Sequence, residues 1–151
     1  MERILGSFSP YIYAILRIVA GFLFLMHGTQ KVLGFPARTP NPCQCPTTPP
    51  PSDFMAALAG ASGYLELVLG LLILVGLFGG WASFIASGMM AVAYFASHQG
   101  RGILPIQNGG ELAALYSFVF LFIAAYGSGV WSIDSLLSRK DSGAGAARAE
   151  G

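Results

Sequence analysis

The sequence contains few charged residues, little cysteine and no excess of positive charge, and each shortage excludes a class of protein. Charged side chains make up 10% of the 151 residues, whereas a soluble globular domain carries about 25%. A formal net charge of +1 provides no basic surface for nucleic acid. The two cysteines lie one residue apart, too few and too close for a disulfide framework or a zinc finger. The lipid bilayer is therefore the partner to expect.

Long apolar runs take the place of the missing charge, since 54% of the residues are hydrophobic. A helix that crosses a bilayer needs about 20 apolar residues, and four blocks are suited to this: 11–33, 54–77, 81–98 and 111–130. Each block is continuous rather than alternating, which indicates helices and not the strands of a barrel. Arg17 interrupts the first block and no small-residue cleavage site follows, so this block is a retained helix, not a signal peptide. The sequence predicts an all-α bundle of four transmembrane helices.

The positive residues are divided unequally between the two sides of this predicted bundle. The side with both termini carries Arg3, Arg139, Lys140 and Arg148. The other side carries Arg38 and Arg101, with Lys31 at its edge. Because positive charge near helix ends favours the cytoplasm, both termini are predicted to be cytoplasmic. We expect an N-terminal segment at 1–10, a membrane domain at 11–134 with a proline-rich outer loop at 34–53, and a disordered tail at 135–151. The expected location is a bacterial plasma membrane, crossed several times.

Two ionisable residues lie inside the apolar blocks and need compensation. Arg17 belongs to the first block and Glu66 to the second, and a charge at a helix centre costs at least about 2.5–3.5 kcal/mol on insertion scales. Helical spacing places Arg17 on one face with Gly21, Gly28 and Lys31, where the glycines allow close approach of a second helix. Counted inward from the outer ends of the two helices at about 1.5 Å per residue, Arg17 and Glu66 lie at similar depths. An arginine side chain can span the remaining gap, which predicts a buried Arg17–Glu66 ion pair. Such a pair is either functional or purely structural.

Further polar residues gather at the predicted outer helix ends. They are His27, Lys31, His98 and Glu111. With Glu66 below them, they outline a polar pocket open to the outside; the alternative is that they anchor the helices at the interface with their polar tips in water. No Glu-x-x-His pair lies on one helix, as a di-iron bundle requires, so no metal site is predicted.

Four segments in order resemble the DoxX family of small bacterial membrane proteins: LRIVAGFLFLMHGTQKVLGF, GYLELVLGLLILVGL, MMAVAYFASH and NGGELAALYSFVFLFIAAYGSGVWSID. The resemblance covers residues 16–134 and implies a four-helix transmembrane bundle. The residues that match the family pattern are Arg17, His27, Gly28, Lys31, Glu66, His98, Asn108 and Glu111. The loop that contains Cys43 and Cys45 is an insertion relative to typical members, so no family role is carried onto it.

The family takes its name from a subunit of an archaeal thiosulfate:quinone oxidoreductase, and some relatives are linked to redox stress and thiol homeostasis. The resemblance and the polar pocket together favour a quinone-linked redox subunit. Arg17, Lys31, Asn108 and Glu111 would bind the ligand, with a cation stabilising the negative charge that reduction creates. Glu66, His27 and His98 would relay protons, since histidine ordinarily titrates near neutral pH.

The source of electrons and two other functions stay open at this stage. No haem or flavin motif is present, so electrons would come from a redox partner protein or from Cys43 and Cys45, whose small ring would form a strained disulfide. The second hypothesis is a small-solute or proton-coupled carrier, which would need a homo-oligomer because four helices are few. The third is a structural or assembly subunit. Replacing Glu66 by Gln would distinguish a structural charge from a functional one.

Overall fold

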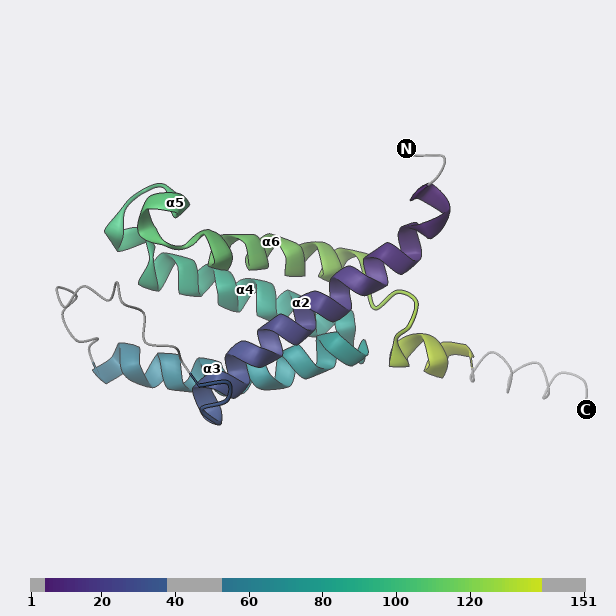
Figure 1. The fold of residues 1–151 in the computed structure, drawn as a ribbon, viewed down its shortest axis with the longest axis horizontal. Coiled ribbons are helices and arrows are strands. Elements are labelled where there is room, and N and C mark those ends of the chain that lie inside the picture. Colours follow the sequence, from purple (N-terminus) through teal and green to yellow (C-terminus); the bar gives the residue numbers. More distant parts are fainter. Residues whose placement is uncertain (1–4, 38–52, 140–151) are drawn as a thin grey trace, which may run out of the picture.

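Four long helices make up most of the computed structural model, which describes residues 5–37 and 53–139. They are α2 (Ser9–Val32), α3 (Asp53–Val75), α4 (Gly79–Ser97) and α6 (Glu111–Tyr126). Shorter elements are η1 (Gly6–Phe8), η2 (Gln99–Arg101) and α5 (Pro105–Asn108). No strand occurs in these two described ranges (Figure 1), so the prediction of an all-α fold is confirmed. The orientation of the termini stays a prediction.

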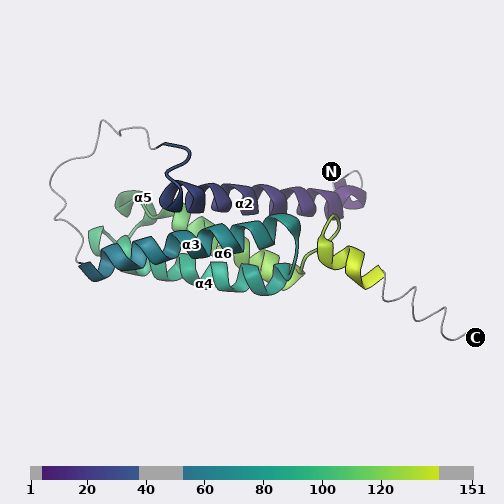
Figure 2. The same ribbon diagram turned by 90° about the horizontal axis from the view of Figure 1, so that it is seen from below.

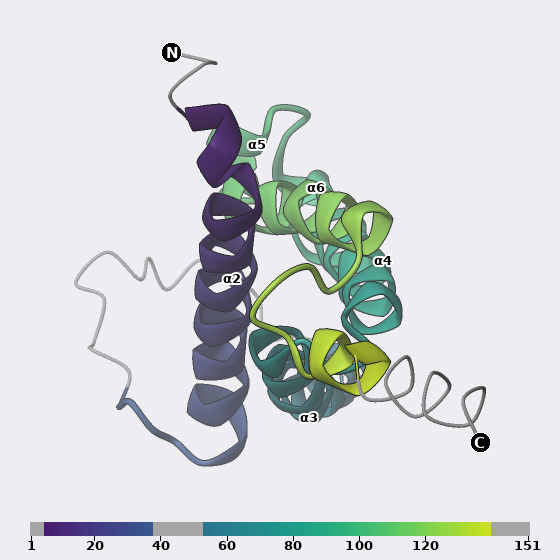
Figure 3. The same cartoon turned by 90° about the vertical axis from the view of Figure 1, so that its right-hand side faces the viewer.

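The helices form one elongated bundle with two different ends. Figures 1 and 2 show that α2 begins at the same end at which α6 finishes, and we name this the terminal end. The α3–α4 turn and residues 127–139 also lie there. The opposite end, where α2 finishes and α5 lies, is named the loop end. In the end-on view, the four long helices surround one central region, with α2 on one side of it and α4 on the other (Figure 3).

Glycines bring α2 and α3 into backbone contact. A β-carbon on Gly21 would lie 2.6 Å from the backbone nitrogen of Leu74, and one on Gly70 would lie 2.6 Å from that of Leu25. Gly28 is pressed in the same way against Leu67. The face predicted to allow a close helix approach therefore does so, because only glycine leaves the space that the partner backbone fills.

Large apolar side chains are found both inside the bundle and on its outer surface. Phe24, Ile73, Phe120 and Ile123 are almost completely buried and form the centre of the core. Many others are exposed, among them Val19, Phe22, Phe84, Val92, Phe118 and Phe122. An outward apolar surface of this extent suits a lipid environment and not water.

By length and composition, two described helical stretches are able to cross a membrane, Gly6–Val32 and Gly79–Arg101. The apolar stretches Gly60–Val75 and Glu111–Tyr126 are shorter. The four-pass topology therefore stays a prediction.

The structure corrects two predictions about the segment that follows the last long helix. The apolar block suggested a helix to 130, but α6 ends at Tyr126, since Gly127 takes a backbone conformation of φ 87° and ψ −165°. Residues 133–139 are helical, so a disordered tail beginning at 135 is wrong for its first five residues. The hydroxyl of Ser132 accepts the backbone N–H of Ser135 at 3.2 Å and caps this short helix. The rest of the predicted tail and the loop with Cys43 and Cys45 lie outside the described residues.

Candidate functional site

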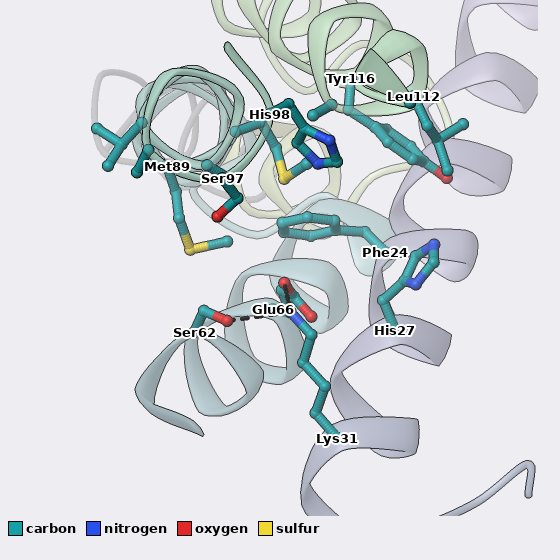
Figure 4. Close-up of a pocket in the computed structure, with 16 residues that line it drawn as sticks. Phe24, His27, Lys31, Ser62, Glu66, Met89, Ser97, His98, Leu112 and Tyr116 are labelled. Atoms are coloured by element: carbon teal, nitrogen blue, oxygen red, sulfur yellow. Dashed lines mark hydrogen bonds and ion pairs between the residues drawn. The ribbon is translucent and has the colours of Figure 1, made fainter. Parts of the chain in front are cut away.

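A pocket of about 390 Å³ opens at the loop end, between α2, α3, α4 and the start of α6. Its apolar walls include Phe24, Met89, Met90, Val92, Leu112 and Tyr116. Its polar groups are His27, Lys31, Ser62, Glu66, Ser97 and His98. Figure 4 shows Lys31, Ser62 and Glu66 on one side and His98, Tyr116 and Leu112 across from them. The structure thus brings together four of the residues predicted from sequence: His27, Lys31, Glu66 and His98.

An ion pair between α2 and α3 forms the polar side of the pocket. The ammonium of Lys31 donates to Glu66 Oε1 at 2.5 Å and to Ser62 Oγ at 3.0 Å. The two charges differ in burial, because the side chain of Lys31 is 29% exposed and that of Glu66 only 6%. Gly28 permits this pairing, since its missing side chain lets α2 approach α3 beside Glu66. Lysine therefore reaches from the mouth of the pocket down to a carboxylate in its wall.

The second oxygen of Glu66 is the least satisfied acceptor in the pocket. Glu66 Oε2 is buried and accepts no hydrogen bond from any residue that the structure describes. A buried acceptor without a donor costs about 1–3 kcal/mol, and a charged one costs more. Natural proteins keep such groups where a ligand or solvent supplies the missing donor.

His98 faces the pocket from the end of α4 and is oriented by the following loop. Its Nδ1 lies 3.2 Å from the carbonyl oxygen of Asn108. A carbonyl only accepts, so Nδ1 carries a proton, and Nε2 of the neutral ring is then an acceptor.

Asn108 itself is 3% exposed and is held by three bonds. Its amide donates to Gly102 O at 2.9 Å and to Tyr94 Oη at 3.2 Å, and its oxygen accepts from Gly110 N at 2.8 Å. Asn108 therefore positions the wall of the pocket and does not line it.

The other two residues predicted at this end are placed differently. His27 lines the pocket at its exposed side, and its ring meets Tyr116 edge-on with the ring centroids 6.3 Å apart. Glu111 is exposed in the first turn of α6 and lines a separate surface groove with Leu115 and Phe118. A carboxylate at a helix N-terminus is stabilised by the helix dipole, which accounts for Glu111 without a ligand.

Arg17 lies at the terminal end, and the predicted Arg17–Glu66 ion pair is wrong. Gly28 on α2 lies level with Glu66, and the eleven residues from Arg17 to Gly28 correspond to about 16 Å of helix. An arginine side chain does not span that length. Arg17 therefore does not line the pocket.

The guanidinium of Arg17 binds backbone carbonyls instead of a carboxylate. Its Nη1 donates to Ile73 O at 2.7 Å and to Leu74 O at 2.9 Å in the last turn of α3, where Ile73 O also accepts a hydrogen bond from Gly76 N at 3.2 Å. Its Nη2 donates to Trp131 O at 2.8 Å and, more weakly, to Val130 O at 3.5 Å. Arg17 is 0% exposed. The arginine thus caps one helix and ties the segment after α6 to it.

Asp134, which the sequence analysis did not identify, binds the start of α4 at the same end of the bundle. Its carboxylate accepts the backbone N–H groups of Phe78 at 3.0 Å and Gly79 at 3.3 Å, at the start of α4, and the hydroxyl of Ser128 at 2.5 Å. Partial burial acts to raise the pKa of Asp134, but these hydrogen bonds and the charge of Arg17 together hold that pKa below its ordinary value. The residue lies just beyond the last apolar block, where no hydropathy signal marks it.

Comparison with known proteins gives a family match. The DoxX family profile matches residues 12–99. An uncharacterized protein of Haemophilus influenzae is 40% identical over 139 residues, which cover 90% of this chain and 98% of that relative. No solved structure matches the chain.

Proposed function

Because this chain belongs to the DoxX family of membrane proteins, we propose that its loop-end pocket binds a membrane quinone and that the protein is a quinone-linked redox subunit. The observation that carries the proposal is the combination in one pocket of a buried, half-satisfied carboxylate with aromatic and thioether walls. A quinone has a flat apolar ring with polar oxygens at opposite ends, and it needs both kinds of surface.

Size and wall chemistry support this ligand class. A pocket of about 390 Å³ falls within the range of about 300–1,000 Å³ that is usual for small-molecule sites. Phe24 and Tyr116 offer ring faces and edges, and Met89 and Met90 offer sulfur contacts that adapt to an aromatic ligand. The polar groups stand on different walls, where they can meet the two ends of one ring (Figure 4).

The pocket residues have distinct roles in this proposal. Lys31 has one N–H left after its bonds to Glu66 and Ser62, and it would donate to a ligand oxygen and stabilise negative charge that forms there. Glu66 and His98 would hold or pass the two protons that accompany two electrons. His27 would stand at the exposed side of this proton route.

Electrons must enter from outside the pocket. A dithiol supplies two electrons and two protons when it becomes a disulfide, and these convert a quinone to its hydroquinone with no atom left over. A partner protein with such a dithiol, or Cys43 and Cys45, would meet this requirement.

The first test is mass spectrometry of an organic extract of the gently solubilised, purified protein. We expect quinone at near-stoichiometric level in the wild type and loss of quinone in Lys31→Met. Arg101→Met is the matched control, because Arg101 is an exposed cation at the same end that does not line the pocket. Thermal unfolding of each variant tests whether loss of ligand is separate from loss of the fold.

Two other results would change the assignment. An extract that contains only bulk phospholipid, from a protein without quinone reductase activity towards thiol or thiosulfate donors, would contradict a quinone role. Uptake of a small anion driven by a pH gradient in proteoliposomes would then favour a carrier. Without uptake, the chain would be an assembly subunit.

A further inference from the structure

Two acceptors of the pocket, one on Glu66 and one on His98, bear on which redox form binds. Glu66 Oε2 is buried and receives no hydrogen bond within the described part of the chain. His98 has its Nδ1 directed to the Asn108 carbonyl, so the neutral ring presents Nε2 as a second acceptor. Glu66 lines the pocket from α3 and His98 from the end of α4, and the ring of Phe24 lies between them in the view of Figure 4.

The donors of the pocket do not discriminate between the two forms. The ammonium of Lys31 already donates to Glu66 Oε1 and Ser62 Oγ, which leaves one N–H. A quinone carbonyl and a hydroquinone hydroxyl both accept a hydrogen bond from such a group. Lys31 therefore contributes similarly to either form.

The acceptors do discriminate, because a quinone has no hydrogen to donate. A hydroquinone donates one O–H from each end of its ring, and a bonded donor removes the cost of an unpaired buried carboxylate oxygen. A quinone in the same place would set a carbonyl oxygen against that carboxylate oxygen, and the two would repel each other.

We infer that the pocket selects the hydroquinone form of its ligand, with Glu66 Oε2 and His98 Nε2 as acceptors for the two hydroxyl groups. This inference rests on the proposed quinone function and names the redox form that the site stabilises. Tighter binding of the reduced form makes the bound quinone a stronger oxidant than the free one. The site would then favour the arrival of electrons at quinone, not their withdrawal from hydroquinone.

The test compares three ligands on the full-length protein in detergent, by calorimetric titration without oxygen. The ligands are a decyl-tailed benzoquinone, its hydroquinone, and the dimethyl ether of that hydroquinone, which has the same ring but no O–H. One charge-assisted hydrogen bond predicts a preference for hydroquinone over quinone of about tenfold or more. The dimethyl ether should bind no better than the quinone. This ligand series needs no mutant.

A pair of variants assigns the preference to one side chain. Glu66→Gln should reduce the preference by about tenfold, because an amide is a weaker acceptor than a carboxylate. Glu111→Gln makes the same change on an exposed carboxylate outside the pocket and should keep the wild-type preference. A tenfold preference corresponds to a rise of about 30 mV in the midpoint potential of a two-electron couple, so redox titration of the bound quinone is an independent readout.

The possible failures are distinguishable. Equal binding of quinone and hydroquinone, or tighter binding of quinone, would overturn the inference and leave the proposed function standing. An equal preference in wild type and Glu66→Gln would also overturn it, since the acceptor would then lie elsewhere. Binding of none of the three ligands would contradict both the inference and the quinone function.

Discussion

The two ends of the bundle each bury a charged side chain, but the two side chains differ in their hydrogen-bond partners and in whether they line a pocket. At the terminal end, both terminal nitrogens of Arg17 donate to carbonyls from α3 and from the segment after α6; its Nε is buried without a partner among the described residues, but Arg17 does not line the loop-end pocket. At the loop end, Glu66 has one oxygen bonded to Lys31 and one oxygen without a donor, on the wall of a pocket. A buried charge marks a site only where some of its bonding capacity faces a cavity.

This contrast also separates two uses of charge in an apolar helix. Helix ends have free carbonyl or N–H groups that need partners, and Arg17 and Asp134 supply these at the end of α3 and the start of α4. Such residues stabilise the bundle without contacting a ligand. Glu66 lies within α3, where the backbone groups are already bonded, and Lys31 in the last turn of α2 donates to side chains of α3 and not to free carbonyls.

Removal of Arg17 should give the largest loss of stability. Arg17→Met leaves the carbonyls of Leu74 and Trp131 without their donor, and each such group costs about 1–3 kcal/mol when buried. We expect a loss of about 3–5 kcal/mol in the free energy of unfolding, measured by chemical or thermal unfolding in detergent. Arg17→Lys should lose less, because one ammonium still reaches some of the carbonyls. A folded, fully stable Arg17→Met protein that had lost its ligand would reverse the assignment of the two ends.

The glycine contact between α2 and α3 offers a way to disturb both ends at once. Gly70→Ala places a β-carbon 2.6 Å from the backbone nitrogen of Leu25, so the two helices must move apart. We expect destabilisation of about 1–3 kcal/mol and weaker ligand binding, because Lys31 on α2 and Glu66 on α3 separate. Gly88→Ala in α4 is the control, since its β-carbon would have no atom within 4 Å. That change should be neutral or stabilising, by up to about 1 kcal/mol.

Asp134 should contribute a smaller, pH-dependent stabilisation at the terminal end. Its pKa is lowered in the folded protein, so the unfolded chain binds the proton more tightly. The contribution is therefore complete above the ordinary aspartate pKa of about 3.9 and is lost as the pH falls through the lower folded value. Asp134→Asn should cost about 1 kcal/mol at neutral pH. In unfolding curves from pH 7 down to pH 2, the difference between wild type and variant should shrink below about pH 3.9; a constant difference would exclude the charge as the cause.

Glu66→Gln should have the smallest effect on stability and a large effect on the ligand. Lys31 is partly exposed, and a pair of which one member reaches water contributes about 1 kcal/mol or less. The glutamine oxygen can still accept from Lys31. Thermal unfolding and ligand content should thus change independently in this variant, whereas in Arg17→Met the ligand is lost only with the fold. Misfolding of Glu66→Gln with a normal pocket in Arg17→Met would contradict the comparison.

The fold was predictable because its main signal is local. Long apolar blocks specify helices wherever they occur, and the four predicted ranges agree with α2, α3, α4 and α6 within a few residues except at the end of α6. That end was missed because hydropathy continues through 127–130, where Gly127 and Gly129 adopt positive φ and break the helix. Backbone conformation, and not hydropathy, decides where the last helix finishes.

The pocket was predictable in part, for a different reason. Polar residues near the ends of apolar helices converge when the helices pack side by side, and this placed His27, Lys31, Glu66 and His98 together. The partner of Arg17 was not predictable in this way, because its acceptors are main-chain carbonyls and every residue has one. Side-chain patterns alone therefore suggested a carboxylate partner. The residue count from the outer helix ends also placed Glu66 too deep, since it lies level with Gly28.

The carbonyl partners of Arg17 also impose an order on the assembly of the protein. Ile73 and Leu74 are separated from Arg17 by 56 and 57 positions, but Trp131 is separated from it by 114. During synthesis, α2 and α3 can pair as soon as both have emerged. The Nη2 of Arg17 obtains its closest acceptor only after Trp131 has been added. A ribosome that stops before residue 131 therefore leaves a charged donor unfilled inside an apolar helix pair. Both terminal nitrogens of Arg17 therefore have their short-bonded acceptors only in a chain that extends through residue 131.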